Sequence, residues 1–129
     1  MPTRPLFTIT SILVVGLGLA WLVVPEQMLL SWGATPDQTL VYMSRRYAVL
    51  FFGYGAILWG SRSAAPSPTW RWIALGTLLT TALMATMSLV GVVTQTIAFS
   101  GLLALVVEVA LTAGFAWALL VGKDRGDAR

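Results

Sequence analysis

Long apolar runs with short polar segments between them are the feature that most restricts how this chain can fold. The clearest runs cover residues 6–24, 70–93 and 97–121 of a 129-residue sequence. A helix needs about 20 apolar residues to cross the roughly 30 Å hydrocarbon core of a bilayer, and each run meets that length. The runs therefore predict membrane-spanning helices.

The first run also has features of a signal peptide. Arg4 precedes it, and residues 18–20 resemble a cleavage site of small residues. The apolar stretch nevertheless continues to Val24 and ends only at Pro25. We therefore expect an uncleaved transmembrane helix.

A further span is predicted in the middle of the chain. The uncharged stretch from Tyr47 to Trp59 is too short to cross a bilayer, so the helix has to begin near Leu40 and cover residues 40–60. This places Arg45 and Arg46 at the membrane boundary or below it.

Composition supports a chain that lies almost wholly in the membrane. Charged residues make up 10% of it and hydrophobic residues 57%, whereas a soluble domain carries about 25% charged residues. The length allows one domain and leaves no room for a soluble one beside four spans. The predicted fold class is all-α: an integral membrane four-helix bundle formed by residues 1–129 as a single domain.

The sequence contains no Cys and no His. This excludes disulfides, thiol catalysis, a His-containing catalytic triad and the usual zinc and haem sites. Its five acidic residues, of which only Glu108 lies well inside a span, do not form a ligand set for other metals. We expect no cofactor and no metal. The eight basic residues are scattered among apolar runs, so nucleic acid is not an expected partner.

The connections between the spans differ in character. The segment from Glu26 to Trp32 mixes polar and large apolar residues after a Pro that suits a helix start, and Gly33 can cap its end. We predict a short interfacial helix there, with an irregular loop as the alternative. Residues 60–68 form a loop rich in Pro, Ser and Gly, and residues 94–96 form a tight polar hairpin.

Basic residues set the predicted orientation, because Lys and Arg favour cytoplasmic connections. They lie before the first span, around the second connection and after the fourth span: Arg4, Arg62, Arg71, Lys123, Arg125 and Arg129. We therefore expect both termini to be cytoplasmic, in a bacterial inner membrane. Aromatic residues suit the two interfaces, with Trp59, Trp70, Trp72 and Trp117 on the cytoplasmic side and Trp21, Trp32 and Phe99 on the other.

Glu108 lies about halfway along the fourth span, where a carboxylate costs several kcal/mol unless it is partnered or protonated. Neighbours such as Thr112 suggest that its face points into the bundle. Stripes of small and polar residues on the third and first spans could meet it: Thr77, Thr81, Met84, Ser88 and Gly91, and Thr8, Ser11 and Gly18. The stripes fit a polar seam or ordinary helix packing. Glu108 fits a structural hydrogen bond or ion pair, or a proton, cation or ligand site.

Arg45 and Arg46 are the cations close enough to pair with Glu108. Adjacent helical residues point about 100° apart, so we expect one Arg to turn inward and the other to reach the interface. Arg46 is favoured as the inward one, because Gly53 follows it by seven positions. Snorkelling of both, with lipid phosphate as counter-ion, is the alternative.

Tyr47, Phe51 and Tyr54 form an aromatic stripe at steps of four and three. Such a stripe serves lipid contact or core packing, or it forms a wall for an apolar ligand.

The layout resembles the small four-helix bacterial membrane proteins grouped around DoxX. The resemblance rests on the interfacial segment after the first helix, Arg46-Tyr47 opening the second, Gly53 six residues after Tyr47, and the short polar third turn. It implies an inner-membrane four-helix bundle, in some cases accessory to a redox or other membrane complex, and it implies no catalytic residues.

These features lead to a non-enzymatic membrane protein, an accessory subunit of a membrane complex or a binder of an apolar ligand or lipid. A membrane-protein partner or a homo-oligomer is compatible with it. One alternative is a small oligomeric proton- or cation-coupled transporter or channel that uses Glu108. Another is a membrane isomerase or cyclase with Glu108 as general acid or base.

Overall fold

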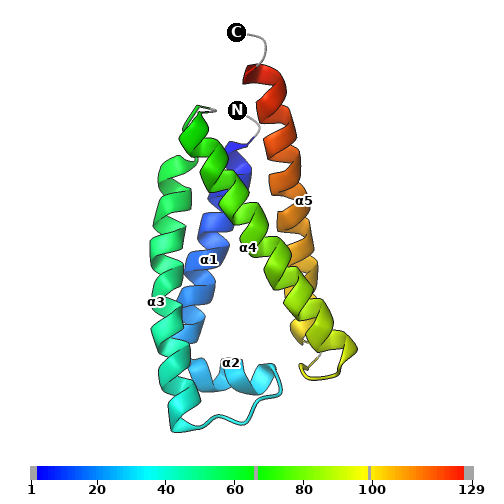
Figure 1. Ribbon diagram of the computed structural model, residues 1–129. Coiled ribbons are helices and arrows are strands. Elements are labelled where there is room, and N and C mark those ends of the chain that lie inside the picture. Colours follow the sequence, from blue (N-terminus) through cyan, green and yellow to red (C-terminus); the bar gives the residue numbers. More distant parts are fainter. Residues whose placement is uncertain (1–2, 66, 99, 127–129) are drawn as a thin grey trace.

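Five helices make up the described part of this computed structural model, which comprises residues 3–65, 67–98 and 100–126, without the side chains of residues 100 and 122–126. They are α1 (Arg4–Val23), α2 (Pro25–Ser31), α3 (Gln38–Ser61), α4 (Pro68–Val93) and α5 (Ser100–Gly126) (Figure 1). Within these described residues, three segments are long and apolar enough to cross a membrane: Arg4–Val23, Pro68–Val93 and Gly101–Val121. The chain is an all-α integral membrane protein, as predicted.

The helix α3 corresponds to the predicted second span but is less apolar than the other long helices. Its 24 residues cover about 36 Å at the helical rise, which is enough for a crossing. Among the long helices of the described ranges it is the one that is not apolar enough to count as a candidate span. Arg45, Arg46 and a polar first turn lower its hydropathy.

Side-chain caps explain why α3 and α4 begin two residues before the predicted ranges 40–60 and 70–93. The Asp37 carboxylate accepts a hydrogen bond from the Leu40 backbone N–H at 2.8 Å. The Ser67 hydroxyl accepts one from the Trp70 backbone N–H at 3.2 Å. Each cap satisfies a backbone donor that the first helical turn leaves free.

The predicted short helix after the first span is present as α2, and the alternative of an irregular loop is wrong. Pro25 opens it, and Gly33 follows it with a left-handed φ of 84°. The Gly33 and Ala34 N–H groups donate to the carbonyls of Leu30 and Leu29, both at 3.0 Å. This pair of bonds is a Schellman ending, in which glycine adopts the left-handed conformation at low cost.

The connection between α4 and α5 is longer than the predicted hairpin of residues 94–96. The Thr96 and Ile97 N–H groups both donate to the Gly91 carbonyl, at 2.9 and 3.3 Å, and Ala98 N–H donates to the Trp32 carbonyl at 3.2 Å. Because these donors are used outside a helix, α5 begins at Ser100 and not at residue 97.

The helices form two pairs, α1 with α3 and α4 with α5, which meet mainly at one end of the molecule (Figure 1). A buried cluster joins the pairs there: Phe7, Leu58, Trp70, Ala74, Phe115 and Ala118. The Phe7 ring lies 5.7 Å from the Trp70 ring and 5.2 Å from the Phe115 ring, between centroids. These aromatic contacts fasten α1 to α4 and α5.

Away from this cluster the two pairs diverge, so that the ribbons form a tall triangle with α2 at its base (Figure 1). The hydrogen bond from Ala98 N–H to the Trp32 carbonyl ties the end of α2 to the α4–α5 connection. The molecule is thus joined at both ends. We call the sides of the two helix pairs that face each other between these ends the inner faces.

Candidate functional site

Glu108 lies on α5 against α4, as the small and polar residues around it suggest. Its carboxyl lies near the side chain of Ser88 of α4, which is buried with 5% of its surface exposed. The Glu108 Oε2 atom is buried and has no hydrogen-bond partner among the described residues. Thr112, one turn further along α5, donates its hydroxyl proton to the Glu108 backbone carbonyl at 2.7 Å. Ser88 is therefore the residue through which Glu108 makes a polar contact with α4.

The hydroxyls of the predicted α4 stripe serve their own helix. Thr77 donates to the Ile73 carbonyl at 2.8 Å, and Thr81 donates to the Thr77 carbonyl at 3.0 Å. Both residues are buried. Met84, placed by the spacing in the same stripe, is instead 46% exposed. The stripe therefore fits helix packing with a single polar contact to α5.

Two residues of the α1 stripe, Ser11 and Gly18, lie against α3 and not against Glu108. The buried Ser11 hydroxyl donates to the Gly55 carbonyl at 2.7 Å. A Cβ atom on Gly18 would lie 2.9 Å from Phe51 Cβ and 3.2 Å from the Ala48 carbonyl oxygen. These small residues let the two backbones approach closely, which is a common use of Gly and Ser in membrane helices.

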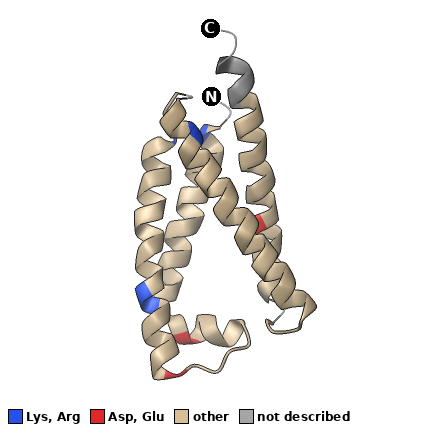
Figure 2. Cartoon of the chain, viewed as in Figure 1, with Lys and Arg blue, Asp and Glu red and all other residues tan. Residues whose placement is uncertain are grey.

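Arg45 and Arg46 are not brought together with Glu108. Both side chains are exposed on α3, which packs against α1 while Glu108 belongs to the other helix pair. The blue segment in the half of α3 nearest α2 marks the two Arg residues in Figure 2. Gly53, used to favour Arg46 as the inward residue, faces open space.

The aromatic stripe of α3 divides. Tyr47 is 62% exposed, whereas Tyr54 packs against the buried cluster. The Tyr54 hydroxyl lies near Thr77 of α4 but has no hydrogen bond of good geometry within the described chain. Tyr54 therefore contributes to contact between the helix pairs, and Tyr47 does not reach that cluster.

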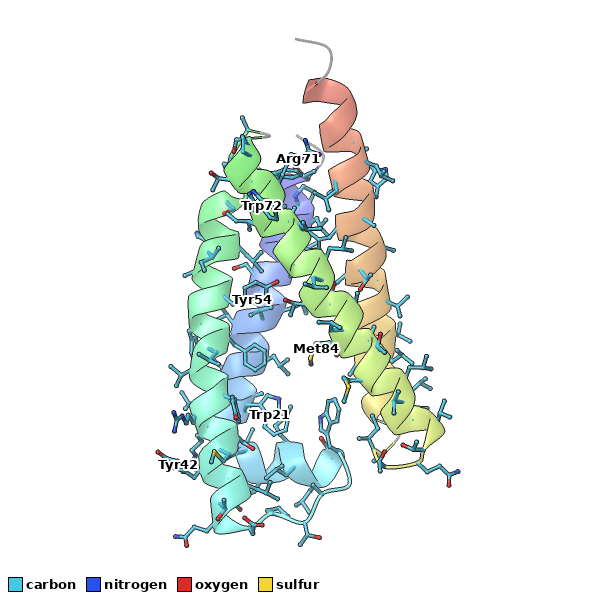
Figure 3. All side chains as sticks on the ribbon, viewed as in Figure 1. Trp21, Tyr42, Tyr54, Arg71, Trp72 and Met84 are labelled. Atoms are coloured by element: carbon cyan, nitrogen blue, oxygen red, sulfur yellow. The ribbon has the colours of Figure 1, made fainter. Side chains whose placement is uncertain are left out.

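The inner faces carry large side chains whose proximity the helical spacing in the sequence did not predict. Trp21 of α1, Tyr54 of α3 and Met84 of α4 all point into the space between the two pairs (Figure 3). Trp21 is half-buried and Met84 is 46% exposed, so they are not packed as a core. The sequence signal for Trp21 was its place near the end of α1, which suggested an interface anchor instead.

Apart from Arg45 and Arg46, the basic residues with described side chains lie at one end of the molecule (Figure 2). Arg4, Arg62 and Arg71 belong to the end that carries the buried cluster, and Glu26 and Asp37 belong to the end that carries α2. The Arg62 guanidinium stacks 3.9 Å from the centre of the Trp59 ring, a pairing suited to an interface. Four further residues used for orientation and anchoring have side chains outside the described part: Phe99, Lys123, Arg125 and Arg129.

Comparison with known protein families, with curated proteins and with solved structures finds no match to this chain. The resemblance to the DoxX group therefore stays a prediction from the layout. The site has to be interpreted from its own residues: a polar contact between α4 and α5, and two inner faces that carry partly exposed aromatic and Met side chains.

Proposed function

We propose that the chain crosses the membrane four times, with both termini on the cytoplasmic side and α2 in the opposite interface. The length of α3 and its packing along α1 support a crossing. The basic residues at the end with the termini support the orientation. The three regions rich in Lys and Arg all belong to that end in a four-crossing chain.

We further propose that the protein is a non-enzymatic binder of a lipid-like apolar molecule, held between the inner faces. The observation that carries this proposal is the incomplete contact between the pairs. They touch mainly at the buried cluster, against which Tyr54 packs, while Trp21 and Met84 point into the space between the pairs (Figure 3). Aromatic and Met side chains adapt well to flexible apolar ligands.

The position of α2 favours a lipid chain over a transmembrane partner helix between the pairs. A helix that crosses the whole bilayer would meet α2 at one end and the buried cluster at the other. An acyl or isoprenoid chain occupies about half the bilayer thickness and can enter sideways from the hydrocarbon. A partner subunit would have to pack on the outside of the molecule.

A bulky residue on an inner face tests the ligand. Met84→Trp should lower the amount of lipid that stays bound through purification in mild detergent severalfold, because the indole occupies the ligand's place. Mass spectrometry of the extracted molecules measures this amount. Leu79→Trp is the matched control: Leu79 is exposed on α4 and lies about 140° around the helix from Met84.

Equal retention by the two variants would overturn the ligand proposal, as would a wild-type protein that retains no lipid. A membrane protein that copurifies at a fixed ratio with lipid-free chain would instead support the accessory-subunit alternative. Circular dichroism and a thermal transition confirm that each variant folds.

The buried, unpartnered Oε2 atom of Glu108 favours a second candidate, a proton- or cation-coupled transporter. An intramembrane acid with no cation facing it is a possible proton carrier. This candidate predicts proton-coupled flux in liposomes that Glu108→Gln abolishes. Flux that is unchanged by this substitution would remove it.

A further inference from the structure

The outer face of α3 carries a basic and aromatic surface in the half nearest α2. Tyr42, Arg45 and Arg46 are all exposed there, and Tyr42 points away from the rest of the molecule (Figure 3). Arg46 lies about 160° around the helix from buried Ala48, so it is opposite the face that packs on α1. We call these three residues the Arg45–Arg46 surface.

The two guanidinium groups have no acidic partner in the described part of the chain. The Asp37 carboxylate, which is the acid closest in sequence, caps the first turn of α3 through the Leu40 N–H. The Glu108 carboxyl lies near Ser88 on the other helix pair. Two exposed positive charges, about 100° apart around the helix, therefore stand uncompensated on α3.

In a crossing α3, the side chains of Arg45 and Arg46 can extend from just below the membrane boundary to the lipid phosphate groups. Arg45 is seven residues from the first residue of α3, which corresponds to about 10 Å along the helix. Long basic side chains at that depth extend toward the headgroups. Guanidinium groups bind phosphate oxygens in a two-pronged geometry, and the Tyr42 hydroxyl can donate a further hydrogen bond.

An apolar track continues from this surface toward the other end of α3. Val49, Leu50, Gly53 and Ile57 are exposed and share the outer face with Arg46 at helical spacing. A Cβ atom at Gly53 would meet nothing within 4 Å, so the track is open at this residue. Headgroup contacts at one end and an apolar track below them match the shape of a phospholipid.

We propose that the Arg45–Arg46 surface binds a phospholipid of net negative charge in the leaflet on the α2 side. The ammonium group of a zwitterionic lipid offsets the charge of its phosphate, and two adjacent guanidinium groups repel it. An anionic lipid has no such group. The proposal rests on α3 crossing the bilayer, which belongs to the proposed function, but it does not depend on what occupies the inner faces.

Native mass spectrometry of the full chain with added phosphatidylglycerol or phosphatidylcholine tests this site. The wild-type protein should bind phosphatidylglycerol more tightly than phosphatidylcholine. Removal of one basic residue near a membrane surface weakens anionic lipid binding about fivefold, so Arg45→Gln with Arg46→Gln should weaken it about 25-fold. Arg71→Gln is the matched control, since Arg71 is exposed at the other end of the molecule.

Three results would overturn the proposal: equal binding of the two lipids by the wild type, an equal loss in Arg71→Gln, or an acidic protein bound at this surface in place of lipid. Arg45→Lys with Arg46→Lys keeps the charge and should keep most of the preference, which separates lipid binding from a folding defect. Met84→Trp should leave the preference for phosphatidylglycerol unchanged. A failure of the ligand proposal for the inner faces can therefore be told apart from a failure of this proposal. Labelling of Cys residues introduced on either side of α3, from opposite sides of the membrane, tests independently whether α3 crosses.

Discussion

At the scale of single residues, Glu108 and Ser88 form the polar contact between α4 and α5. A hydrogen bond between membrane helices contributes on average about 0.6 kcal/mol, so the pair is a modest stabiliser and not a structural necessity. The carboxyl faces no cation among the described residues. A carboxyl in an apolar helix is therefore poorly explained by stability alone. Measuring the contribution of Glu108 to the free energy of unfolding tests this.

A double-mutant cycle between these residues gives the first prediction. Glu108→Gln keeps a hydrogen-bonding group for Ser88, so the free energy of unfolding should change by less than about 1 kcal/mol. Ser88→Ala should destabilise the wild type more than it destabilises Glu108→Leu, by about 0.6 kcal/mol. Equilibrium unfolding in detergent measures Glu108→Gln and the four proteins of the cycle, which are the wild type, Ser88→Ala, Glu108→Leu and the double variant. Thr80→Ala is the control, since the exposed Thr80 hydroxyl bonds only to the Gly76 carbonyl of its own helix.

Additive effects of the two substitutions would contradict a direct hydrogen bond. A large gain in stability for Glu108→Leu would be compatible with the bond and would indicate that the carboxyl is kept for function at a cost in stability.

The residue scale also shows where prediction from sequence ended. Glu108 was found because a charge in an apolar run is conspicuous, and Ser88 was found by its helical spacing. The inward turn of Arg46 rested on Gly53, but the glycine that α3 places against α1 is Gly55, whose carbonyl accepts the Ser11 hydroxyl. Two glycines separated by one residue face opposite ways, and periodicity alone does not choose between them.

At the scale of elements, α1 and α3 approach closely because small residues line their contact. A Cβ atom on Gly18 would lie 3.2 Å from a backbone oxygen of α3, whereas one on Gly16 would meet nothing within 4 Å. Both glycines lie in the same helix and lose the same conformational freedom, so a comparison between them isolates the packing.

Gly18→Val should therefore be less stable than Gly16→Val by about 1–3 kcal/mol, the usual cost of overpacking a tight contact. Thermal unfolding in one detergent, followed by circular dichroism, checks the difference. Equal stability of the two variants would show that α1 and α3 can separate without cost, and that their close contact does not hold the pair together.

The presence of the long helices was predictable from the sequence, because the length and hydropathy of the apolar runs determine it. The residues at which the helices begin and end were less predictable. The ends depend on particular hydrogen bonds, such as the Asp37 cap of α3 and the Ala98 N–H bond that delays α5. The short α2 was predictable because Pro25 and Gly33 mark its two ends: Pro favours the first turn of a helix, and Gly favours the position that follows its last turn.

At the scale of the whole molecule, the sequence predicted a four-helix bundle whose small and polar stripes fit either a polar seam or helix packing. The structure has two helix pairs joined at their ends. All faces of these helices are largely apolar. In a chain surrounded by lipid, hydropathy therefore does not predict which helices pack against each other. The residues that decide it are few: Gly18 and Gly55 in one pair, and the Phe7, Trp70 and Phe115 rings between the pairs.

The number of crossings is testable because the chain has no Cys, so a single introduced Cys reports its own side of the membrane. Thr35→Cys, Ser63→Cys and Gln95→Cys each place a thiol at an exposed position in a connection between helices. A membrane-impermeant maleimide should label Ser63→Cys only from the cytoplasmic side and the other two only from the opposite side.

Labelling of Thr35→Cys and Ser63→Cys from the same side would show that α3 does not cross, although it has the length to do so. It would also remove the basis for a lipid phosphate site at Arg45 and Arg46. The fully reversed pattern would keep four crossings and overturn only the orientation. Because α3 alone joins these two positions, the comparison isolates the one long helix whose composition argues against a crossing and whose packing along α1 argues for it.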